Sequence, residues 1–205
     1  QTDKDDKLVV LYASNKDEQH AYIDAAKEKG YEVLFLDSPI VSHLIQKLES
    51  TEENVTFVRV DGDHIDNLIK KDEEQISKLN EEEKKSLTTI LTGIIPQDKF
   101  TVQLEAMDSK ANPFIITQPE FMRRMKEMQQ SGGGGGMFGM GNMPDMYNLV
   151  VNTNNELIGE ILSTKTAKKK ERLVNQALDL ARLSQNLLKG EELTTFIKRS
   201  FDMIK

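Results

Sequence analysis

The sequence contains no cysteine among its 205 residues. Disulfides and thiol chemistry are therefore excluded, and the composition fits a reducing compartment such as the cytoplasm. No apolar run approaches the roughly 20 residues that a membrane-spanning helix needs, and no signal peptide is visible. Basic side chains are outnumbered, with 27 Lys and Arg against 34 Asp and Glu. Because nucleic acid binding needs a basic surface, we expect a cytoplasmic protein with neither nucleic acid nor membrane as its partner.

Recognisable catalytic patterns are also missing. The histidines are His20, His43 and His64, which lie on different segments without a second ligand at zinc spacing, so we expect no metal site. No nucleophile elbow accompanies a serine, and no glycine-rich phosphate loop follows the first predicted strand. We therefore predict no catalytic residue and no cofactor for this chain, and we do not expect it to be an enzyme.

Two aspartates leave one alternative open. Asp37 and Asp61 follow predicted strands, at the edge where open α/β sheets usually bind ligands. The alternative is a receiver-like or small-ligand-binding αβα module fused to a generic dimerisation domain. A receiver site also needs acidic residues after the first strand to hold magnesium, whereas that strand ends in Ala-Ser-Asn at 13–15. We favour a simpler interpretation, in which Asp37 caps a helix and Asp61 lies in a turn.

The first 70 residues alternate between strand and helix patterns. Apolar runs at 8–13, 31–36 and 55–60 have the length of buried strands, and helical spacing of apolar residues lies between them. Gly30 stands where a helix C-cap belongs. This order predicts a small α/β domain with three layers, helices packing on both faces of a parallel sheet. A nearly apolar-free charged run begins near residue 72, so we predict domains at 1–72 and 73–205.

The second half has an α+β pattern. Asn80 and Glu83 form a capping-box pair before a helix, and 99–107 alternates as a half-exposed strand typical of antiparallel sheets. Further strands are predicted at 114–117 and 146–151, and Thr153 with Glu156 is expected to cap the next helix. The chain ends in two predicted helices, a helical hairpin at roughly 167–189 and 191–205.

Residues 131–146, SGGGGGMFGMGNMPDM, combine five consecutive glycines with methionines and a phenylalanine. A predicted helix with methionines every third residue precedes this Gly/Met-rich loop, which places them on one face. Such a face is usually core. Methionine specifies a core poorly, however, and flexible methionine-rich surfaces suit binders of varied partners. We therefore predict client binding by Phe121, Met122, Met125, Met128, Met137, Phe138 and Met140.

The last two predicted helices carry apolar residues on more than one side. A single neighbouring helix cannot cover so wide a stripe, and the surplus must be buried against another chain or remain exposed. Two such hairpins around a twofold axis make a four-helix bundle. We therefore predict a homodimer. Its predicted contact residues are Leu173, Ala177, Leu178, Leu180, Ala181, Leu187, Leu188, Leu193, Phe196 and Ile197.

Several long segments together resemble the ninety-kilodalton heat-shock chaperone family, bacterial HtpG type. They are NKDEQHAYIDAAKEKGYEVLFLD with SHLIQKLE, then NPFIITQPEFMRRMKEM, then LVNQALDLARLSQNLLKGEELTTFIKRSFDMI. The resemblance covers nearly the whole chain in the same order. It implies that 1–72 is the small αβα part of the family's middle domain and that 73–205 is its carboxy-terminal dimerisation domain.

The resemblance also implies a function. The chain would be a fragment of an ATP-dependent molecular chaperone, a stress-response protein that binds unfolded or partly folded clients. Its partners would be a second copy of itself and those clients. The family's ATPase domain and arginine loop have no counterpart here, so ATP and magnesium are expected only of the full-length protein. The segment matching 121–130 would be an exposed amphipathic helix where clients dock.

Overall fold

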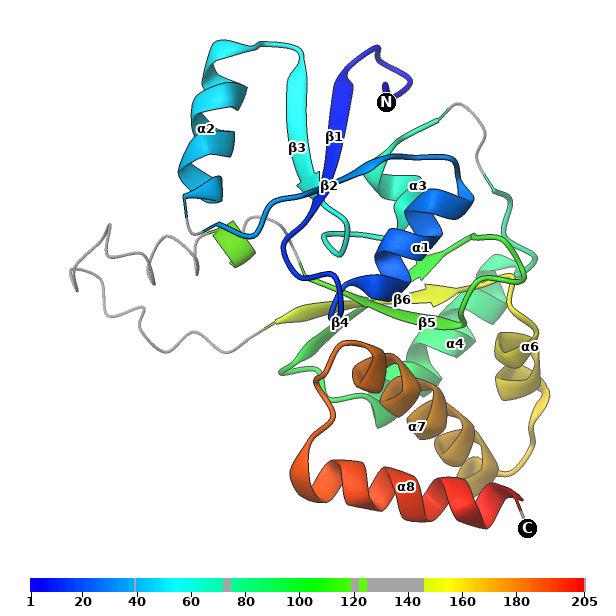
Figure 1. Ribbon diagram of the computed structural model, residues 1–205. Helices are drawn as coiled ribbons and strands as arrows, with labels where there is room; N and C mark the ends of the chain where they lie inside the picture. Colours follow the sequence, from blue (N-terminus) through cyan, green and yellow to red (C-terminus); the bar gives the residue numbers. More distant parts are fainter. Residues whose placement is uncertain (39, 72–74, 119–121, 125–145, 205) are drawn as a thin grey trace. The chain divides into compact units, whose positions relative to one another are not determined.

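The computed structural model describes residues 1–38, 40–71, 75–118, 122–124 and 146–204 (Figure 1). The chain divides into two compact units. Unit 1 comprises Gln1–Glu74 with Thr117–Tyr147, and unit 2 comprises Gln75–Ile116 with Asn148–Lys205. The division after residue 74 lies close to the predicted boundary at 72. Residues 117–147, which the sequence pattern places in the second domain, are grouped with unit 1.

Unit 1 is built on a three-stranded parallel sheet in the order β2-β1-β3. Its strands are β1 (Leu8–Ala13), β2 (Val33–Phe35) and β3 (Val55–Arg59), and Leu11 of the central strand pairs with Val33 on one side and Val58 on the other. The connecting helices are α1 (His20–Glu28), α2 (Val41–Thr51) and the short α3 (Ile65–Leu68). The predicted parallel α/β arrangement is therefore present.

The two faces of this sheet have separate cores because side chains alternate along β1. Val9, Leu11 and Ala13 pack with Ala26 of α1 and Leu68 of α3. On the opposite face, Tyr12 packs with residues of α2, and Figure 1 shows α2 and α1 on opposite sides of the strands. Gly30 ends α1 with φ +75°, the left-handed conformation predicted for its C-cap position.

The second strand differs from its prediction. The run 31–36 predicts a buried strand, but β2 has only three residues and lies at the edge of the sheet. Leu34 and Phe35 of β2 are exposed. An apolar run cannot reveal which strand will lie at an edge, because that depends on the strand order.

Unit 2 begins with α4 (Glu81–Ile94), whose capping box is formed as predicted. The Asn80 side chain accepts a hydrogen bond from the Glu83 backbone at 2.9 Å, and the Glu83 carboxylate accepts one from the Asn80 backbone at 2.9 Å. Leu87 and Leu91 of α4 are fully buried. Four-residue spacing places them on one face of the helix, which is the face that packs into the unit.

The sheet of unit 2 has the strand order β4-β6-β5. The strands are β4 (Phe100–Glu105), β5 (Phe114–Thr117) and β6 (Tyr147–Asn152). Backbone hydrogen bonds join Thr153, just after β6, to Glu105 at the end of β4, and Asn152 to Pro113, just before β5. These pairs indicate that β6 runs parallel to β4 and antiparallel to β5, so the sheet is mixed where the sequence pattern predicts an antiparallel one.

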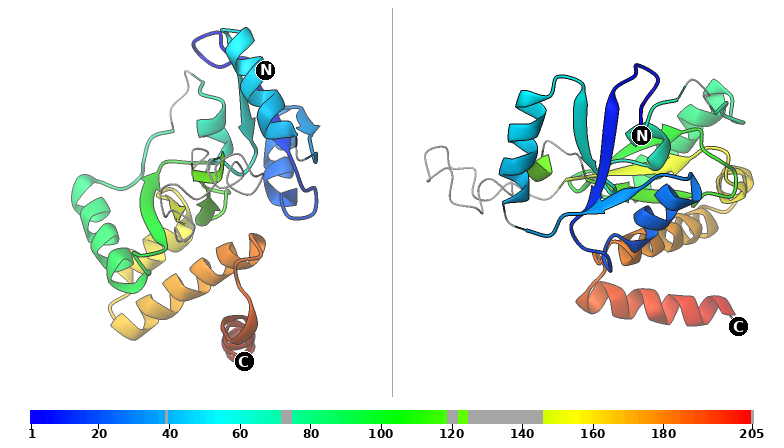
Figure 2. Two further views of the ribbon diagram at one scale, coloured as in Figure 1. Left: turned by 90° about the vertical axis from the view of Figure 1, so that its left-hand side faces the viewer. Right: turned by 45° about the horizontal axis from the view of Figure 1, so that its top comes forward.

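Three helices complete unit 2, namely α6 (Glu156–Ser163), α7 (Ala167–Ser184) and α8 (Gly190–Ile204). Asn155, not Thr153, caps α6, its side chain accepting a hydrogen bond from the Leu157 backbone at 3.0 Å. The predicted hairpin is present as two successive helices. Figures 1 and 2 show, however, that α7 and α8 cross steeply and do not lie side by side along their lengths. Among the described residues, no helix is long and apolar enough to cross a membrane.

Candidate functional site

A polar network ties α8 to α7. Asp179 of α7 accepts a hydrogen bond from Arg199 of α8 at 2.7 Å and one from Arg182 at 3.1 Å. Arg182 also pairs with Glu192 of α8, and Gln176 exchanges hydrogen bonds with Arg199 and Ser200 at 2.9 and 3.0 Å. Charge-assisted hydrogen bonds are directional and stronger than neutral ones. The network therefore fixes how α8 crosses α7, although Phe196 is the only buried residue of α8 among those described.

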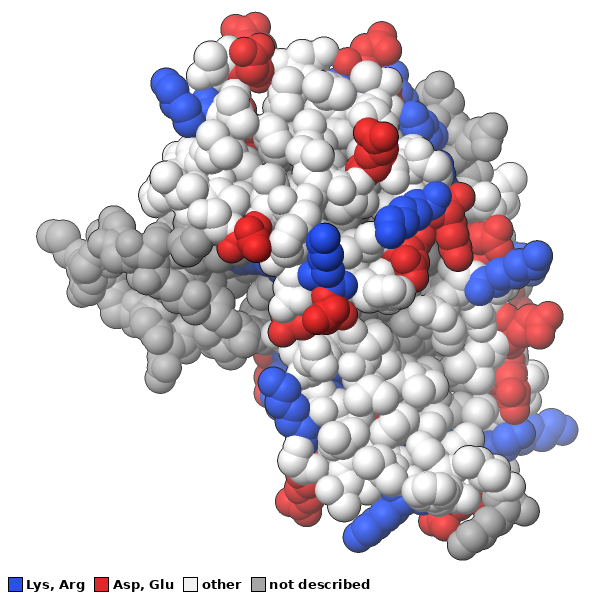
Figure 3. All heavy atoms as spheres, viewed as in Figure 1, with Lys and Arg blue, Asp and Glu red and all other residues white. Residues whose placement is uncertain are grey.

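The two helices expose a large apolar surface within unit 2. On α8, Ile197, Phe201 and Ile204 follow one another at spacings of four and three, and Phe201 and Ile204 are 64% and 81% exposed. On α7, Leu180 and Leu183 are exposed as well. The face of α7 and α8 visible in Figure 3 shows a stretch of surface free of charged side chains, with acidic and basic residues around it. We call these five side chains the α7–α8 apolar face.

The ten predicted dimerisation residues divide into three groups in the structure. Leu180 and Ile197 are exposed and belong to the α7–α8 apolar face. Leu173, Leu187 and Leu193 are half-buried. The remaining five, Ala177, Leu178, Ala181, Leu188 and Phe196, are buried inside the protomer. Leu183, Phe201 and Ile204 lie on the exposed face without being among the ten predicted residues, because helical spacing shows that a helix has several apolar sides but not which side its own chain covers.

The predicted client-binding segment is described at its start, where Met122–Arg124 are helical. Arg123 is only 4% exposed, and its guanidinium donates a hydrogen bond to the Tyr12 hydroxyl at 2.7 Å. Arg124 donates to the Glu49 carboxylate at 2.8 Å and to the Phe57 carbonyl at 2.9 Å. The sequence pattern places both arginines on the polar side of an amphipathic helix, and that side contacts β1, α2 and β3 within unit 1.

The charge of Glu49 is favoured by this contact. Partial burial opposes ionisation of the carboxyl group, but hydrogen bonds from Arg124, the Phe57 backbone and Thr56 outweigh it, and the pKa of Glu49 lies below its ordinary value. A carboxyl group with a lowered pKa stabilises the fold above its ordinary pKa of about 4.3. That contribution is lost as the pH falls through the lowered value, so the contact is intact at neutral pH.

Of the predicted client-binding residues, only Met122 lies within the described part of the chain, and its side chain is half-buried. The others, Phe121, Met125, Met128, Met137, Phe138 and Met140, lie outside the described residues. Met146, the last methionine of the 131–146 loop, is exposed. The described residues therefore show how the segment begins on unit 1, and its role in client binding stays a prediction.

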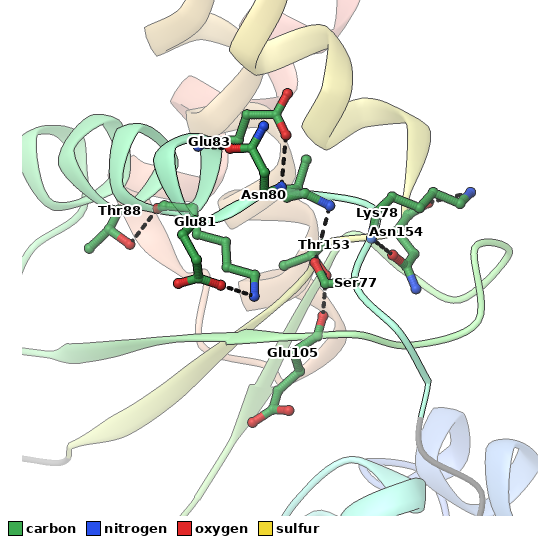
Figure 4. Close-up of polar contacts among 11 residues, drawn as sticks. Ser77, Lys78, Asn80, Glu81, Glu83, Thr88, Glu105, Thr153 and Asn154 are labelled. Carbon is green, nitrogen blue, oxygen red and sulfur yellow. Dashed lines mark hydrogen bonds and ion pairs between the residues drawn. The ribbon is translucent and has the colours of Figure 1, made fainter.

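A second polar cluster fixes residues 76–78, where the chain enters unit 2 (Figure 4). The buried Asn154 side chain accepts a hydrogen bond from the Lys78 backbone at 2.8 Å and donates to the carbonyls of Ile76 and Met107 at 3.1 and 3.0 Å. Ser77 donates to the Thr153 hydroxyl at 2.9 Å, and Thr153 donates to the Glu105 carbonyl at 3.1 Å. These contacts, the Asn154 clasp, occupy Thr153 and explain why it does not cap α6.

The strand ends of unit 1 give little support to the small-ligand alternative. The Asp61 carboxylate is engaged by Arg59 through bonds of 2.6 and 2.9 Å. Burial, with a smaller contribution from Asp61, raises the pKa of Tyr22, so its hydroxyl stays neutral. After β1, the Gln19 side chain accepts hydrogen bonds from the backbones of Ser14 and Asn15 at 2.7 and 2.9 Å. Within the described ranges, no group of three His, Asp or Glu side chains could hold a metal ion.

Comparison with known proteins connects this chain to chaperones. The family described as Hsp90 protein matches residues 4–205. Chaperone protein htpG of Bacteroides fragilis strain 638R and its counterpart in Bacteroides thetaiotaomicron are each 34% identical over the whole chain. A Chaperone protein HtpG of Porphyromonas gingivalis is 41% identical over 80% of the chain and 24% of its own length.

These relatives are longer than the chain, which spans about 40% of the length of the two Bacteroides proteins. The family match extends through both compact units and through the α7–α8 apolar face. It also agrees with the resemblance seen in the long sequence segments. The chain belongs to the Hsp90 family of chaperones and is similar to its bacterial HtpG members.

Proposed function

We propose that the chain is part of an ATP-dependent molecular chaperone, in which it supplies the homodimer interface and a client-binding surface. The observation that carries this proposal is the family match over residues 4–205. ATP and magnesium would be bound elsewhere in the full-length protein, and the domains 1–72 and 73–205 would correspond to the end of the middle domain and the dimerisation domain. The protein would act in the cytoplasm, where unfolded clients arise.

The α7–α8 apolar face supports the dimer part of the proposal. Burying one Leu, Ile or Phe side chain contributes about 1.5–3 kcal/mol. The five side chains are between 40% and 81% exposed, so ten of them in a symmetric dimer would contribute roughly 8–17 kcal/mol, which is comparable with an association cost of roughly 4–15 kcal/mol. The polar network between Asp179, Arg182 and Arg199 also holds α8 in place, so little additional ordering is needed when the second protomer binds.

Client binding is assigned to the methionine-rich segment that begins at Met122. A variant with Met122, Met125 and Met128 changed to serine tests this assignment. We expect weaker suppression of aggregation when citrate synthase is diluted from denaturant, measured by light scattering, with a melting temperature close to that of the wild type. If the three side chains were core, each would contribute about 2–5 kcal/mol to stability and the melting temperature would fall sharply.

The matched control replaces the exposed polar residues Thr195 and Lys198 of α8 with serine, which leaves the methionines intact. This control should suppress aggregation as well as the wild type does. Undiminished suppression by the triple serine variant would contradict the assignment of clients to this segment.

A further inference from the structure

The start of the methionine-rich segment is attached to unit 1 by more than one contact. Gln118 donates a backbone hydrogen bond to the Asp61 carbonyl at 3.2 Å. Arg123 reaches Tyr12 of the central strand, and Arg124 reaches Glu49 of α2 and Phe57 of β3. The attachment therefore includes the central strand β1, the edge strand β3 and α2, all of which are far from the segment in the sequence.

The Arg124 contact is geometrically specific. Its two terminal nitrogens lie 2.8 and 3.3 Å from the two Glu49 oxygens, and one of them also donates to the Phe57 carbonyl. Planar guanidinium geometry matches a carboxylate in this way, and a lysine ammonium cannot reproduce it. Glu49 is held in turn by the Phe57 backbone at 2.8 Å and by Thr56 at 3.3 Å. These two hydrogen bonds orient the Glu49 carboxylate toward Arg124 independently of the arginine itself.

The Arg123 contact is buried. Tyr12 is 3% exposed and Arg123 4% exposed, and the guanidinium lies 5.8 Å from the centre of the Tyr12 ring. A buried guanidinium is costly unless its donors are used, and Arg123 donates to the Tyr12 hydroxyl. If this helix were fully exposed to solvent, Arg123 would not be buried and Arg124 would not be paired with a carboxylate.

We propose that Arg123 and Arg124 are positioning residues for client binding, because they fix residues 122–124 on the β1–α2–β3 layer of unit 1. This inference rests on the proposed function and adds to it how the client-binding segment is held. The segment follows β5 of unit 2 in the sequence, yet its start is attached to unit 1. Client binding then depends on the integrity of the unit 1 sheet as well as on the methionines.

The test compares Arg124→Gln, Glu49→Gln and the double variant in the full chain. Glu49→Gln keeps an acceptor for the Phe57 backbone while removing the charge. We expect roughly tenfold faster amide exchange at 122–124 in each single variant, the change expected when a charge-assisted hydrogen bond is lost. The double variant should exchange no faster than either single variant, because both changes break the same contact.

The functional arm measures the chain concentration that half-suppresses aggregation of citrate synthase diluted from denaturant. We expect this concentration to rise several-fold in Arg124→Gln and in Glu49→Gln. The control is Lys29→Gln, which breaks an exposed ion pair with Asp66 at 2.9 Å elsewhere in unit 1. It should change neither the exchange at 122–124 nor the suppression of aggregation, since surface ion pairs contribute little.

The outcomes separate this inference from the proposed function. Faster exchange at 122–124 without a change in aggregation suppression would show that the arginines do not position the client-binding segment, even if the triple serine variant is impaired. Unchanged exchange in both single variants would also overturn it. The inference is supported if suppression of aggregation is weaker in Arg124→Gln and in Glu49→Gln and normal in Lys29→Gln. An unimpaired triple serine variant would overturn the proposed function itself.

Discussion

His64 places a polar imidazole ring in a buried environment. The residue is 4% exposed, and neither ring nitrogen has a hydrogen-bond partner within the part of the chain that the structure describes. A buried polar group without a partner costs about 1–3 kcal/mol, because the group leaves water without a replacement bond. The other two histidines differ, since His20 lies 3.1 Å from Asp24 and His43 is exposed. Sequence spacing shows no second zinc ligand near His64. It does not reveal that the ring is buried, because burial depends on the fold.

Replacing His64 with leucine should therefore stabilise the chain. Leucine has a similar volume and carries no polar atom, so the desolvation cost disappears. A gain of about 1 kcal/mol raises the melting temperature of a chain of this size by roughly 2–4 °C. Calorimetry measures the shift, and His43→Leu on the surface of α2 serves as the control with no expected gain. A lower melting temperature for His64→Leu would mean that the imidazole forms a bond in solution.

Capping residues show which features of single residues can be predicted from the sequence and which cannot. The Asn80–Glu83 capping box and the left-handed Gly30 are predicted correctly because their partners lie within four residues. Thr153 satisfies the same local pattern, but it bonds to Ser77 and Glu105, and Asn155 caps α6 in its place. Arg123 belongs by helical spacing to the side opposite the methionines, and it is buried against Tyr12. In both cases the competing partner lies far away in the sequence.

At the scale of elements, the Asn154 clasp joins two segments separated by more than seventy residues. It holds the backbone of 76–78 against the end of β6, immediately before the capping box that begins α4 (Figure 4). The Asn154 amide supplies one acceptor and two donors to backbone groups from a single position. The first turn of unit 2 is thus fixed by hydrogen bonds rather than by apolar packing.

Asn154→Ala should destabilise the chain and loosen this entry segment. The change removes three hydrogen bonds and leaves one amide and two carbonyls without partners, at a cost of about 2–4 kcal/mol. Urea unfolding measures the cost, and amide exchange should increase at 76–80. Asn155→Ala is the matched control, because losing an N-cap costs about 0.5–2 kcal/mol and should increase exchange in α6 instead. Equal exchange patterns in the two variants would contradict the clasp.

Element types are largely predictable from this sequence, whereas element exposure is not. The alternation of strands and helices predicts the β1, β2 and β3 sheet, because each pattern depends on nearby residues. The exposure of β2 depends on its edge position, and the mixed direction of the second sheet depends on which strands pair. The steep crossing of α7 and α8 likewise decides which apolar side of each helix is covered.

At the scale of the whole molecule, the central claim is a homodimer formed by the α7–α8 apolar face. Leu178 and Phe196 are buried inside the protomer, so charged substitutions at these two positions would disrupt folding and would not test the dimer interface. Leu180, Ile197 and Phe201 are exposed on two helices that are joined by a polar network, and exposed apolar surface on a soluble protein often marks an interaction site. A second protomer that presents the same face satisfies twofold symmetry.

Sedimentation velocity of Ile197→Asp with Phe201→Asp tests this claim most directly. These side chains lie one helical turn apart on the exposed side of α8, so two aspartates would place buried charges in the interface without disturbing the core. The matched control is Thr195→Asp with Lys198→Asp on the exposed polar side of the same helix. At micromolar concentration the account predicts a dimer for the wild type and the control and a folded monomer for the Ile197 and Phe201 variant. A wild type that sediments as a monomer, or an Ile197 and Phe201 variant that remains dimeric, would contradict it.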